Sequence, residues 1–194
     1  MKKRIRSSIS GLAKVLHSLG FTPNSISVLG LLLAISSATL YVFNSAENCF
    51  IALAGALFLL SGLSDAVDGL IADIYGETTR FGGVLDSVSD RYGDAIVLVG
   101  IILGGLCDLY WGLAALIGSV MVSYVRARAE VDGVEMESVG LMERAERLVL
   151  VFLASIINYY YNGTIYYSII LLALLTNLTV IQRMLHFRRV ASTS

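Results

Sequence analysis

The chain has few charged residues, one proline and two cysteines. Charged residues occupy 15% of its 194 positions, whereas soluble domains carry about 25%, so an ordinary water-soluble domain is not expected. Cys49 and Cys107 lie among apolar neighbours without C-x-x-C spacing. Neither a disulfide framework nor a cysteine zinc site is therefore expected, and we predict that both thiols are buried. No basic stripe alternates with aromatic residues, so we expect no nucleic-acid partner.

Long apolar runs dominate instead. Hydrophobic residues make up 56% of the chain and the mean hydropathy is +0.76. About 20 apolar residues are needed to cross a bilayer, and runs of this kind cover residues 25–43, 48–70, 81–106 and 109–127. Residues 148–182 contain no charge and are divided by a polar, tyrosine-rich turn at 158–163. The sequence therefore predicts an all-α integral membrane protein, a bundle of six spans.

The N-terminal segment differs from the spans. Apolar residues recur at helical spacing between basic ones in residues 2–19, which predicts an amphipathic helix on a membrane surface. The apolar positions of this pattern are Ile5, Ile9, Leu12, Val15, Leu16 and Leu19, and the basic ones are Lys3, Arg6 and Lys14. A signal peptide is not expected, because no cleavage site follows the first apolar run. Pro23 suits the first turn of the next helix.

Lysine and arginine gather at alternate ends of the predicted spans. They precede the first span, occupy the second and fourth connections and close the chain, whereas the other connections carry only Glu47 and Asp108. The positive-inside rule then places both termini and the even-numbered connections in the cytoplasm. We divide the chain into a juxtamembrane helix at 1–20, a membrane domain at 21–187 and a cytoplasmic tail at 188–194.

Four aspartates occur where the sequence otherwise predicts membrane-spanning helix. An ionised carboxylate in hydrocarbon is costly, so such residues indicate a function. Asp65 and Asp68 are three residues apart, and Asp86 and Asp90 are four apart, which places each pair on one helix face. Two such faces turned toward each other need cations between them. The spacing therefore predicts a metal site at the cytoplasmic ends of the second and third spans.

The aspartates belong to a longer motif, D-x-x-D-G-x-x-A-R-x8-G-x3-D-x3-D. Its matching residues are Asp65, Asp68, Gly69, Ala72, Gly82, Asp86 and Asp90. On these residues the chain resembles the CDP-alcohol phosphotransferase family, and Thr22-Pro23-Asn24-Ser25-Ile26-Ser27 is similar to the family's T-P-N-x-I-[ST] segment. The resemblance implies six spans after an amphipathic helix, and an enzyme that moves a phosphatidyl-type group from a CDP-lipid to an alcohol and releases CMP.

The resemblance and the residue chemistry together suggest roles. Cleavage of a pyrophosphate favours hard divalent cations, so we expect Mg²⁺ or Mn²⁺, as two ions about 4 Å apart. Asp65, Asp68 and Asp86 are expected as metal ligands, and Asp90 as the general base, in contact with the second ion as well. The residues expected to bind the donor nucleotide are Pro23, Asn24, Asp68, Gly69, Ala72, Thr79 and Gly82. The two glycines allow close approach to the backbone.

One position departs from the motif. Asp73 stands where the family has an arginine that helps to hold the donor nucleotide, so that contact is not carried over. Arg80, seven residues downstream, is a candidate for the missing positive charge. We expect Asp73, Glu77 and Asp94 to serve as helix caps, to lie in exposed loops or to pair with nearby arginines.

Arginines at the ends of the later spans point to a phosphorylated acceptor. Arginine makes bidentate contacts to phosphate oxygens, which an uncharged alcohol does not need. The residues expected to hold the acceptor phosphate are Arg126, Arg128, Arg144, Arg147 and Arg183. Their segments resemble the phosphatidylinositol phosphate and archaetidylinositol phosphate synthases, which implies inositol 1-phosphate as acceptor. Topology and pairing with glutamates would explain the same arginines without a pocket.

Other hypotheses stay open. A phosphatidylglycerophosphate-type synthase, or a di-inositol phosphate synthase that uses CDP-inositol, fits the same residues, and the donor lipid can be a diacylglycerol or an archaeol. A cation-coupled transporter also places carboxylates in the membrane, but typically shows internal repeats that this sequence lacks. The family resemblance implies a homodimer. Gly93, Gly100, Gly104 and Gly105 either serve such an interface or pack within the bundle.

Overall fold

The structure is a computed structural model that describes the backbone of residues 2–44, 48–136 and 138–192, and the side chains of these residues except 2–9 and 48. Within these ranges every regular element is an α-helix and no strand occurs, which confirms the all-α class. The helices are α1 (Lys2–Ser18), α2 (Pro23–Val42), α3 (Asn48–Tyr75), α4 (Arg80–Leu103), α5 (Leu109–Val131), α6 (Arg144–Asn158) and α7 (Thr164–Ala191).

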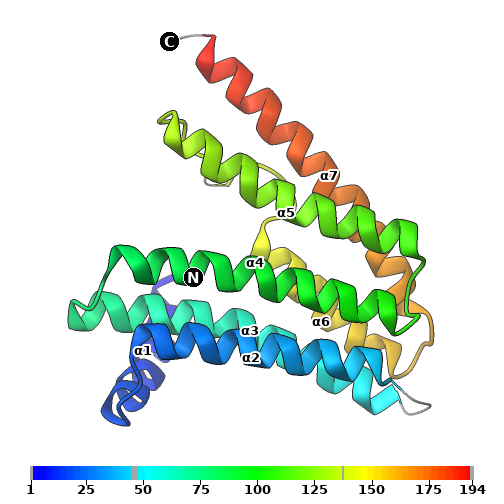
Figure 1. Ribbon diagram of the computed structural model, residues 1–194, viewed down its shortest axis with the longest axis horizontal. Helices are drawn as coiled ribbons and strands as arrows, with labels where there is room; N and C mark the ends of the chain where they lie inside the picture. Colours follow the sequence, from blue (N-terminus) through cyan, green and yellow to red (C-terminus); the bar gives the residue numbers. More distant parts are fainter. Residues whose placement is uncertain (1, 45–47, 137, 193–194) are drawn as a thin grey trace.

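The six helices after α1 form one bundle in which neighbours along the chain run in opposite directions (Figure 1). Helix α2 packs against both α3 and α4, α3 also packs against α6, and α5 packs against α7. Helices α5 and α7 lean together away from α2 and α3, and their C-terminal ends lie on the same side of the molecule as the α3–α4 connection (Figure 1). Residues from α3 through α7 can therefore meet at that end.

Four of these helices are long and apolar enough to cross a membrane: α2, α3 from Cys49 onward, α5 and α7. Helix α4 carries charged residues along its first half, and α6 has only 15 residues. The structure thus contains the six predicted helices after α1, but length and composition mark four of them as candidate spans. The charge on α4 and the shortness of α6 explain the difference.

The helix ends differ from the predicted span limits. Helix α3 continues to Tyr75, α5 to Val131 and α7 to Ala191, and α6 begins at Arg144. The predicted limits followed apolar length, whereas helical hydrogen bonding continues through charged residues once a helix has formed. Helix α2 ends one residue early, at Val42, and α4 ends at Leu103, where the following glycine pair turns the chain.

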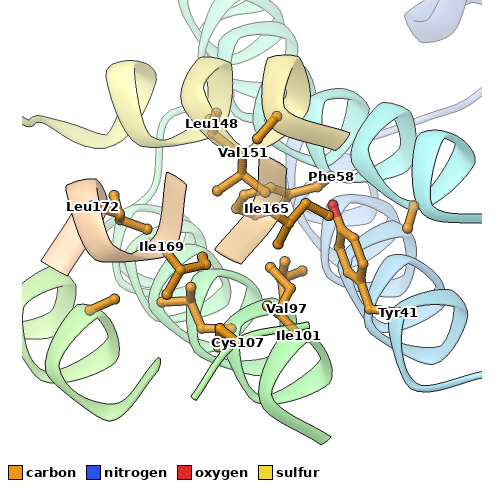
Figure 2. Packing of buried hydrophobic residues seen from close by; sticks show 14 of the residues in the cluster. Tyr41, Phe58, Val97, Ile101, Cys107, Leu148, Val151, Ile165, Ile169 and Leu172 are labelled. Carbon is orange, nitrogen blue, oxygen red and sulfur yellow. The ribbon is translucent and has the colours of Figure 1, made fainter. Parts of the chain in front are cut away.

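The main hydrophobic core joins the six helices from α2 to α7. Figure 2 shows Tyr41 of α2, Phe58 of α3 and Val97 of α4 close to side chains of α6 and α7. The Tyr41 hydroxyl shares a hydrogen bond of 2.6 Å with Ser155 Oγ of α6. Burial of this cluster fixes how α6 lies beside α3, and therefore where the first turn of α6 meets α4.

Helix α1 is present as predicted and packs against α3. Ala13 is fully buried with Val67 and Ile71 of α3, and Leu16 packs against the same cluster. The predicted apolar positions Leu12, Val15 and Leu19 are exposed, whereas the side chains of Ile5, Ile9, Lys3 and Arg6 lie outside the described residues. One side of α1 therefore packs against the protein core.

Four glycines were considered for a dimer interface, and three of them, Gly93, Gly100 and Gly104, pack inside the bundle. A Cβ atom at Gly100 would lie 2.7 Å from the carbonyl oxygen of Ala38 on α2, and one at Gly93 would lie 3.3 Å from the Ala34 side chain. Gly104 faces the carbonyl oxygen of Tyr41, and Gly105 takes a positive φ of 68° in the turn after α4. Close packing of α2 on α4 explains these residues without a second copy of the chain.

The two cysteines lie in different environments. Cys107 is buried in the main core, as predicted. The prediction was wrong for Cys49, which is exposed in the first turn of α3. An apolar neighbourhood in a membrane protein does not distinguish a helix face that packs against protein from one that faces outward.

Candidate active site

A tight turn brings the C-terminal end of α3 back onto α4. Gly76 has a positive φ of 69°, and the Glu77 N–H donates to the carbonyl oxygen of Ala72 at 3.0 Å, as in a Schellman motif. Thr79 then caps α4, because its Oγ1 accepts a hydrogen bond from the Gly82 N–H at 2.9 Å. These local signals place the aspartates of α3 opposite those of α4.

Three aspartates meet at this end of the bundle. One carboxylate oxygen from each of Asp65, Asp68 and Asp86 lies within 4.8 Å of the others. Asp68 is 4% exposed and accepts a hydrogen bond from Ser27 Oγ of α2. Like charges this close repel one another, and a divalent cation with oxygen ligands would offset the repulsion. The donor set therefore fits a hard divalent metal ion. We call these residues the carboxylate group.

A cavity of about 240 Å³ opens between α2, α3 and the start of α4. It is lined by Pro23, Asn24, Ser27, Asp68, Gly69, Ala72, Asp73, Glu77, Thr78, Thr79, Gly82, Gly83 and Asp86. All seven residues predicted to bind the donor nucleotide belong to this set. We call it the glycine cavity because Gly69 and Gly82 keep it open. Gly69 borders open space, whereas a Cβ atom at Gly82 would lie 2.9 Å from both Asn24 Oδ1 and Thr79 Oγ1.

The residues that line the glycine cavity include four carboxylates and no lysine or arginine. Asp73 is among them, so the acidic replacement of the motif arginine faces this space. Arg80, the candidate for the missing charge, is exposed and is not a lining residue. Among the described residues, no cationic side chain in this cavity would bind a negatively charged ligand. A divalent cation bound to the carboxylate group would be the partner of a phosphate there.

A second cavity, of about 190 Å³, lies on the other side of the carboxylate group. It is lined by Asp65, Asp90, Arg91, Asp94, Val122, Ser123, Arg126, Glu143, Arg144, Arg147 and Arg183. We call it the arginine cavity. Four of the five predicted acceptor arginines line it. Arg128 does not, and instead pairs with Asp132 at 2.7 Å on the exposed surface of α5.

The carboxylate group separates the two cavities. Asp68 and Asp86 line the glycine cavity, whereas Asp65 lines the arginine cavity. Asp90, one turn along α4 from Asp86, also faces the arginine cavity and lies outside the carboxylate group. Two ligands, one in each cavity, would therefore meet at the same carboxylates. This is the arrangement that a transfer reaction between two substrates requires.

Residues 21–182 match the family model described as CDP-alcohol phosphatidyltransferase. The chain belongs to this family. It is 37% identical over 184 residues to an archaetidylinositol phosphate synthase of Pyrococcus horikoshii, covering 94% of this chain and 92% of that protein. It is 45% identical over 132 residues to an archaetidylinositol phosphate synthase of Methanothermobacter thermautotrophicus, covering 68% and 67%.

Solved structures of a relative share the fold. The phosphatidylinositol phosphate synthase of Mycobacterium tuberculosis, in complex with manganese and citrate, superposes with a TM-score of 0.79 at 27% identity, covering 93% of this chain and 88% of that one. The same protein with CDP-DAG bound gives 0.78 at 27% identity, covering 92% of each chain. This chain is therefore an enzyme of the phosphatidyltransferase family with that family's fold.

Arg144 links the two halves of this phosphatidyltransferase site. It lies at the start of α6, and its NH1 is 2.8 Å from Asp90 Oδ2 and 3.1 Å from Asp65 Oδ2. The two aspartates belong to α4 and α3, so one guanidinium bridges three helices. The sequence predicted Arg144 for the acceptor site but did not predict that it contacts the aspartates.

Arg183 is held by the protein itself. It is 2% exposed, and its guanidinium donates to the carbonyl oxygen of Val139 at 2.9 Å, to that of Val122 at 2.7 Å and to Glu143 Oε1 at 3.0 Å. These bonds tie α7 to α5 and to the segment before α6. Arg183 lines the arginine cavity, as predicted. Much of its hydrogen-bonding capacity is used in these three bonds to the protein.

The three remaining acidic residues have different surroundings. Glu77 is exposed and accepts from His17 Nε2 of α1 at 3.1 Å, and Asp73 is exposed at the glycine cavity. Asp94 is 8% exposed, within α4, and pairs with Arg144 and Arg147. The expected pairing with arginines is confirmed for Asp94, but the expectation of a cap or an exposed loop was wrong for it.

Sequence reasoning missed several residues of the site. Ser27 holds Asp68 from 41 positions away, and Arg91 and Glu143 line the arginine cavity. A signal was present for Asp94, because Asp86, Asp90 and Asp94 continue one spacing of four residues and so share a helix face. No local signal marks Glu143, since its partner Arg183 lies 40 residues away.

Proposed function

We propose that this enzyme transfers a phosphatidyl-type group from a CDP-lipid to the hydroxyl of inositol 1-phosphate and releases CMP. The observation that carries the proposal is the carboxylate group between a glycine-lined cavity, whose described lining has no basic side chain, and a cavity with five arginines. The names of the archaeal relatives and the CDP-DAG bound to a similar structure support the same reaction.

The donor binds in the glycine cavity. Its cytidine lies against Gly69, Ala72 and Gly82, with Pro23, Asn24 and Thr79 at the edge, and its diphosphate points toward the carboxylate group. Asp65, Asp68 and Asp86 would hold Mg²⁺ or Mn²⁺, as two ions, and Asp90 is proposed to contact the second as well. When bound, the ions would neutralise the diphosphate and the departing CMP.

Asp90 acts on the acceptor. In the arginine cavity its carboxylate accepts the proton of the attacking hydroxyl, whose oxygen forms the new bond to the lipid-side phosphorus while the bond to the CMP oxygen breaks. Arg144 contacts this carboxylate at 2.8 Å and keeps it oriented toward the cavity. Asp90 is therefore proposed as the catalytic base.

The arginines of the cavity hold the acceptor phosphate. Arg126, Arg144, Arg147 and Arg183 line the cavity, and Arg183 is also paired with Glu143. Guanidinium groups match phosphate oxygens in bidentate geometry. An acceptor with a phosphate at one end and a hydroxyl at the other would place that hydroxyl near Asp90.

The membrane arrangement is also proposed. We infer that all six helices from α2 to α7 span the bilayer, and that both termini and the active site face the cytoplasm. Helix α1 then lies on the inner membrane surface through its exposed Leu12, Val15 and Leu19. Residues 1–20, 21–187 and 188–194 form the juxtamembrane helix, the catalytic domain and the tail. A homodimer stays a prediction.

One assay tests the reaction. Purified protein with Mg²⁺ is given CDP-archaeol or CDP-diacylglycerol together with inositol 1-phosphate, glycerol 3-phosphate or unphosphorylated inositol, and CMP release is measured. We expect release with inositol 1-phosphate and little with inositol. Preference for glycerol 3-phosphate would favour a phosphatidylglycerophosphate-type synthase, and activity only with CDP-inositol would favour a di-inositol phosphate synthase. Cation flux into proteoliposomes without CMP release would favour a transporter.

Arg126 and Arg128 provide a matched pair for the acceptor site. They lie two residues apart on α5, but only Arg126 lines the arginine cavity. Replacing Arg126 with alanine is expected to raise the KM for inositol 1-phosphate by about tenfold, since one charged hydrogen bond contributes roughly 1.5–3 kcal/mol. Arg128→Ala should leave this KM within twofold. Equal effects of the two substitutions on steady-state kinetics would contradict the proposed site.

A further inference from the structure

Asp94 lies at the back of the arginine cavity and contacts two of its arginines. It is on α4, one turn after Asp90, and is 8% exposed. Its Oδ1 is 3.4 Å from Arg144 Nε, and its Oδ2 is 2.8 Å from Arg147 NH2. Arg144 and Arg147 are three residues apart and thus share one face of α6. A single buried carboxylate therefore meets two guanidinium groups.

Arg147 depends on this contact. The residue is 4% exposed, and among the described residues Asp94 is the one hydrogen-bond partner of its side chain. Its Nε and NH1 have no partner in the same part of the chain. Buried arginine donors without partners are costly, and this residue lines the arginine cavity. Asp94 thus holds one side of the guanidinium, while Nε and NH1 are buried without a partner among the described residues.

The other arginines of the cavity have hydrogen-bond partners other than Asp94. Arg183 is bound to Glu143 and to two carbonyl oxygens, Arg91 donates to the Ser87 carbonyl oxygen at 2.7 Å, and Arg126 donates to Glu130 at 2.8 Å. Arg144 has Asp65 and Asp90 besides Asp94. Without Asp94, Arg144 would keep its contacts to the reacting carboxylates and Arg147 would lose its anchor.

We propose that Asp94 is a positioning residue for the acceptor: it holds Arg147, and through its second oxygen Arg144, in the orientation that binds the acceptor phosphate. The proposal rests on the function proposed above, because it assigns the phosphate of the acceptor to this cavity. Asp94 touches neither the substrate nor the reacting atoms. Its loss should weaken acceptor binding more than donor binding or turnover.

The substitution Asp94→Asn tests this role. Asparagine keeps the size of the side chain but removes the charge and turns a donor toward one of the arginines. We expect the KM for inositol 1-phosphate to rise by about tenfold or more, with the KM for the CDP-lipid and kcat changing less than threefold. Asp132→Asn is the matched control, since Asp132 pairs with the exposed Arg128 at 2.7 Å outside the cavity. It should leave all three constants unchanged.

A double-mutant cycle separates positioning from a general effect on folding. If Asp94 acts through Arg147, then Asp94→Asn combined with Arg147→Gln should have nearly the same KM as Arg147→Gln alone. Additive effects of the two substitutions on KM would overturn the proposal. So would a fall in kcat at unchanged KM for the acceptor. If Asp94→Asn does not fold, the charge-preserving Asp94→Glu must fold with a KM near that of the wild type, and failure of both variants to fold would also overturn it.

A binding measurement distinguishes this proposal from the function on which it rests. Inorganic phosphate should raise the unfolding temperature of the wild-type protein, and Asp94→Asn should need about tenfold more phosphate for the same shift. If the wild type binds phosphate in this way but releases no CMP with any acceptor, the proposed reaction is wrong while Asp94 still positions a phosphate site. Equal phosphate dependence of both proteins would overturn the role of Asp94.

Discussion

Replacement of Asp86 with asparagine is expected to reduce CMP release by on the order of 10³-fold, because it removes one of three carboxylates that hold the metal where charge develops in the reaction. Asp86 comes from α4, whereas Asp65 and Asp68 come from α3, so the variant loses the only ligand that α4 contributes to the carboxylate group. The size change is negligible, and helix packing should be preserved.

The measurement combines kinetics with metal binding. Initial rates of CMP release are recorded with saturating CDP-lipid, and the Mn²⁺-dependent rise in unfolding temperature is recorded for the same samples. Asp108→Asn is the control, since Asp108 lies in the α4–α5 connection and accepts a hydrogen bond from the Tyr166 hydroxyl at 2.6 Å. It should change neither quantity. Asp86→Asn with normal Mn²⁺ stabilisation and normal turnover would contradict the assignment of the metal site.

Replacement of Asp90 with asparagine is expected to lower kcat by about 10²–10⁴-fold, the usual contribution of a general base. Asp90 lies outside the carboxylate group and faces the arginine cavity. The variant should therefore keep most of its Mn²⁺ stabilisation and its KM for the CDP-lipid, in contrast to Asp86→Asn. Rapid-quench measurement of a single turnover would report the chemical step directly.

Two results would separate the possible roles of Asp90. Loss of metal stabilisation equal to that in Asp86→Asn would identify it as a metal ligand above all. A kcat within threefold of the wild type would show that another group accepts the proton. Because Asp90 pairs with Arg144 at 2.8 Å, Arg144→Gln is a useful companion: it should weaken acceptor binding as well as turnover, whereas Asp90→Asn acts mainly on turnover.

The lining of the glycine cavity shows what changes when Asp73 stands in place of the motif arginine. Its described lining has no lysine or arginine, and Asp73 adds a carboxylate where the family motif has an arginine. A diphosphate in this cavity depends on the metal for its charge compensation more strongly than it would with a basic residue there. Arg80, the candidate for the missing positive charge, is exposed and is not among the residues that line the cavity.

The sequence alone determined what is local. The spacing of Asp65, Asp68, Asp86 and Asp90 placed them on helix faces, and the apolar runs predicted the helices, with limits that differ most at the C-terminal end of α7. The family resemblance predicted seven residues for the donor site, all of which line one cavity. These features depend on helical periodicity and on short turns such as the one at Gly76. Both depend on residues that are close together in the sequence, so they can be predicted without the tertiary structure.

The tertiary structure alone decided how segments far apart in the chain meet. It shows that Arg126 lines the arginine cavity and Arg128 does not. It also shows that Arg183 binds backbone carbonyl groups and Glu143, and that Asp94 pairs with Arg147. These outcomes depend on the rotation and depth of α5, α6 and α7 against α4, which burial of the main core sets (Figure 2). Charge at a helix end is visible in a sequence, but its partner 40 or 50 residues away is not.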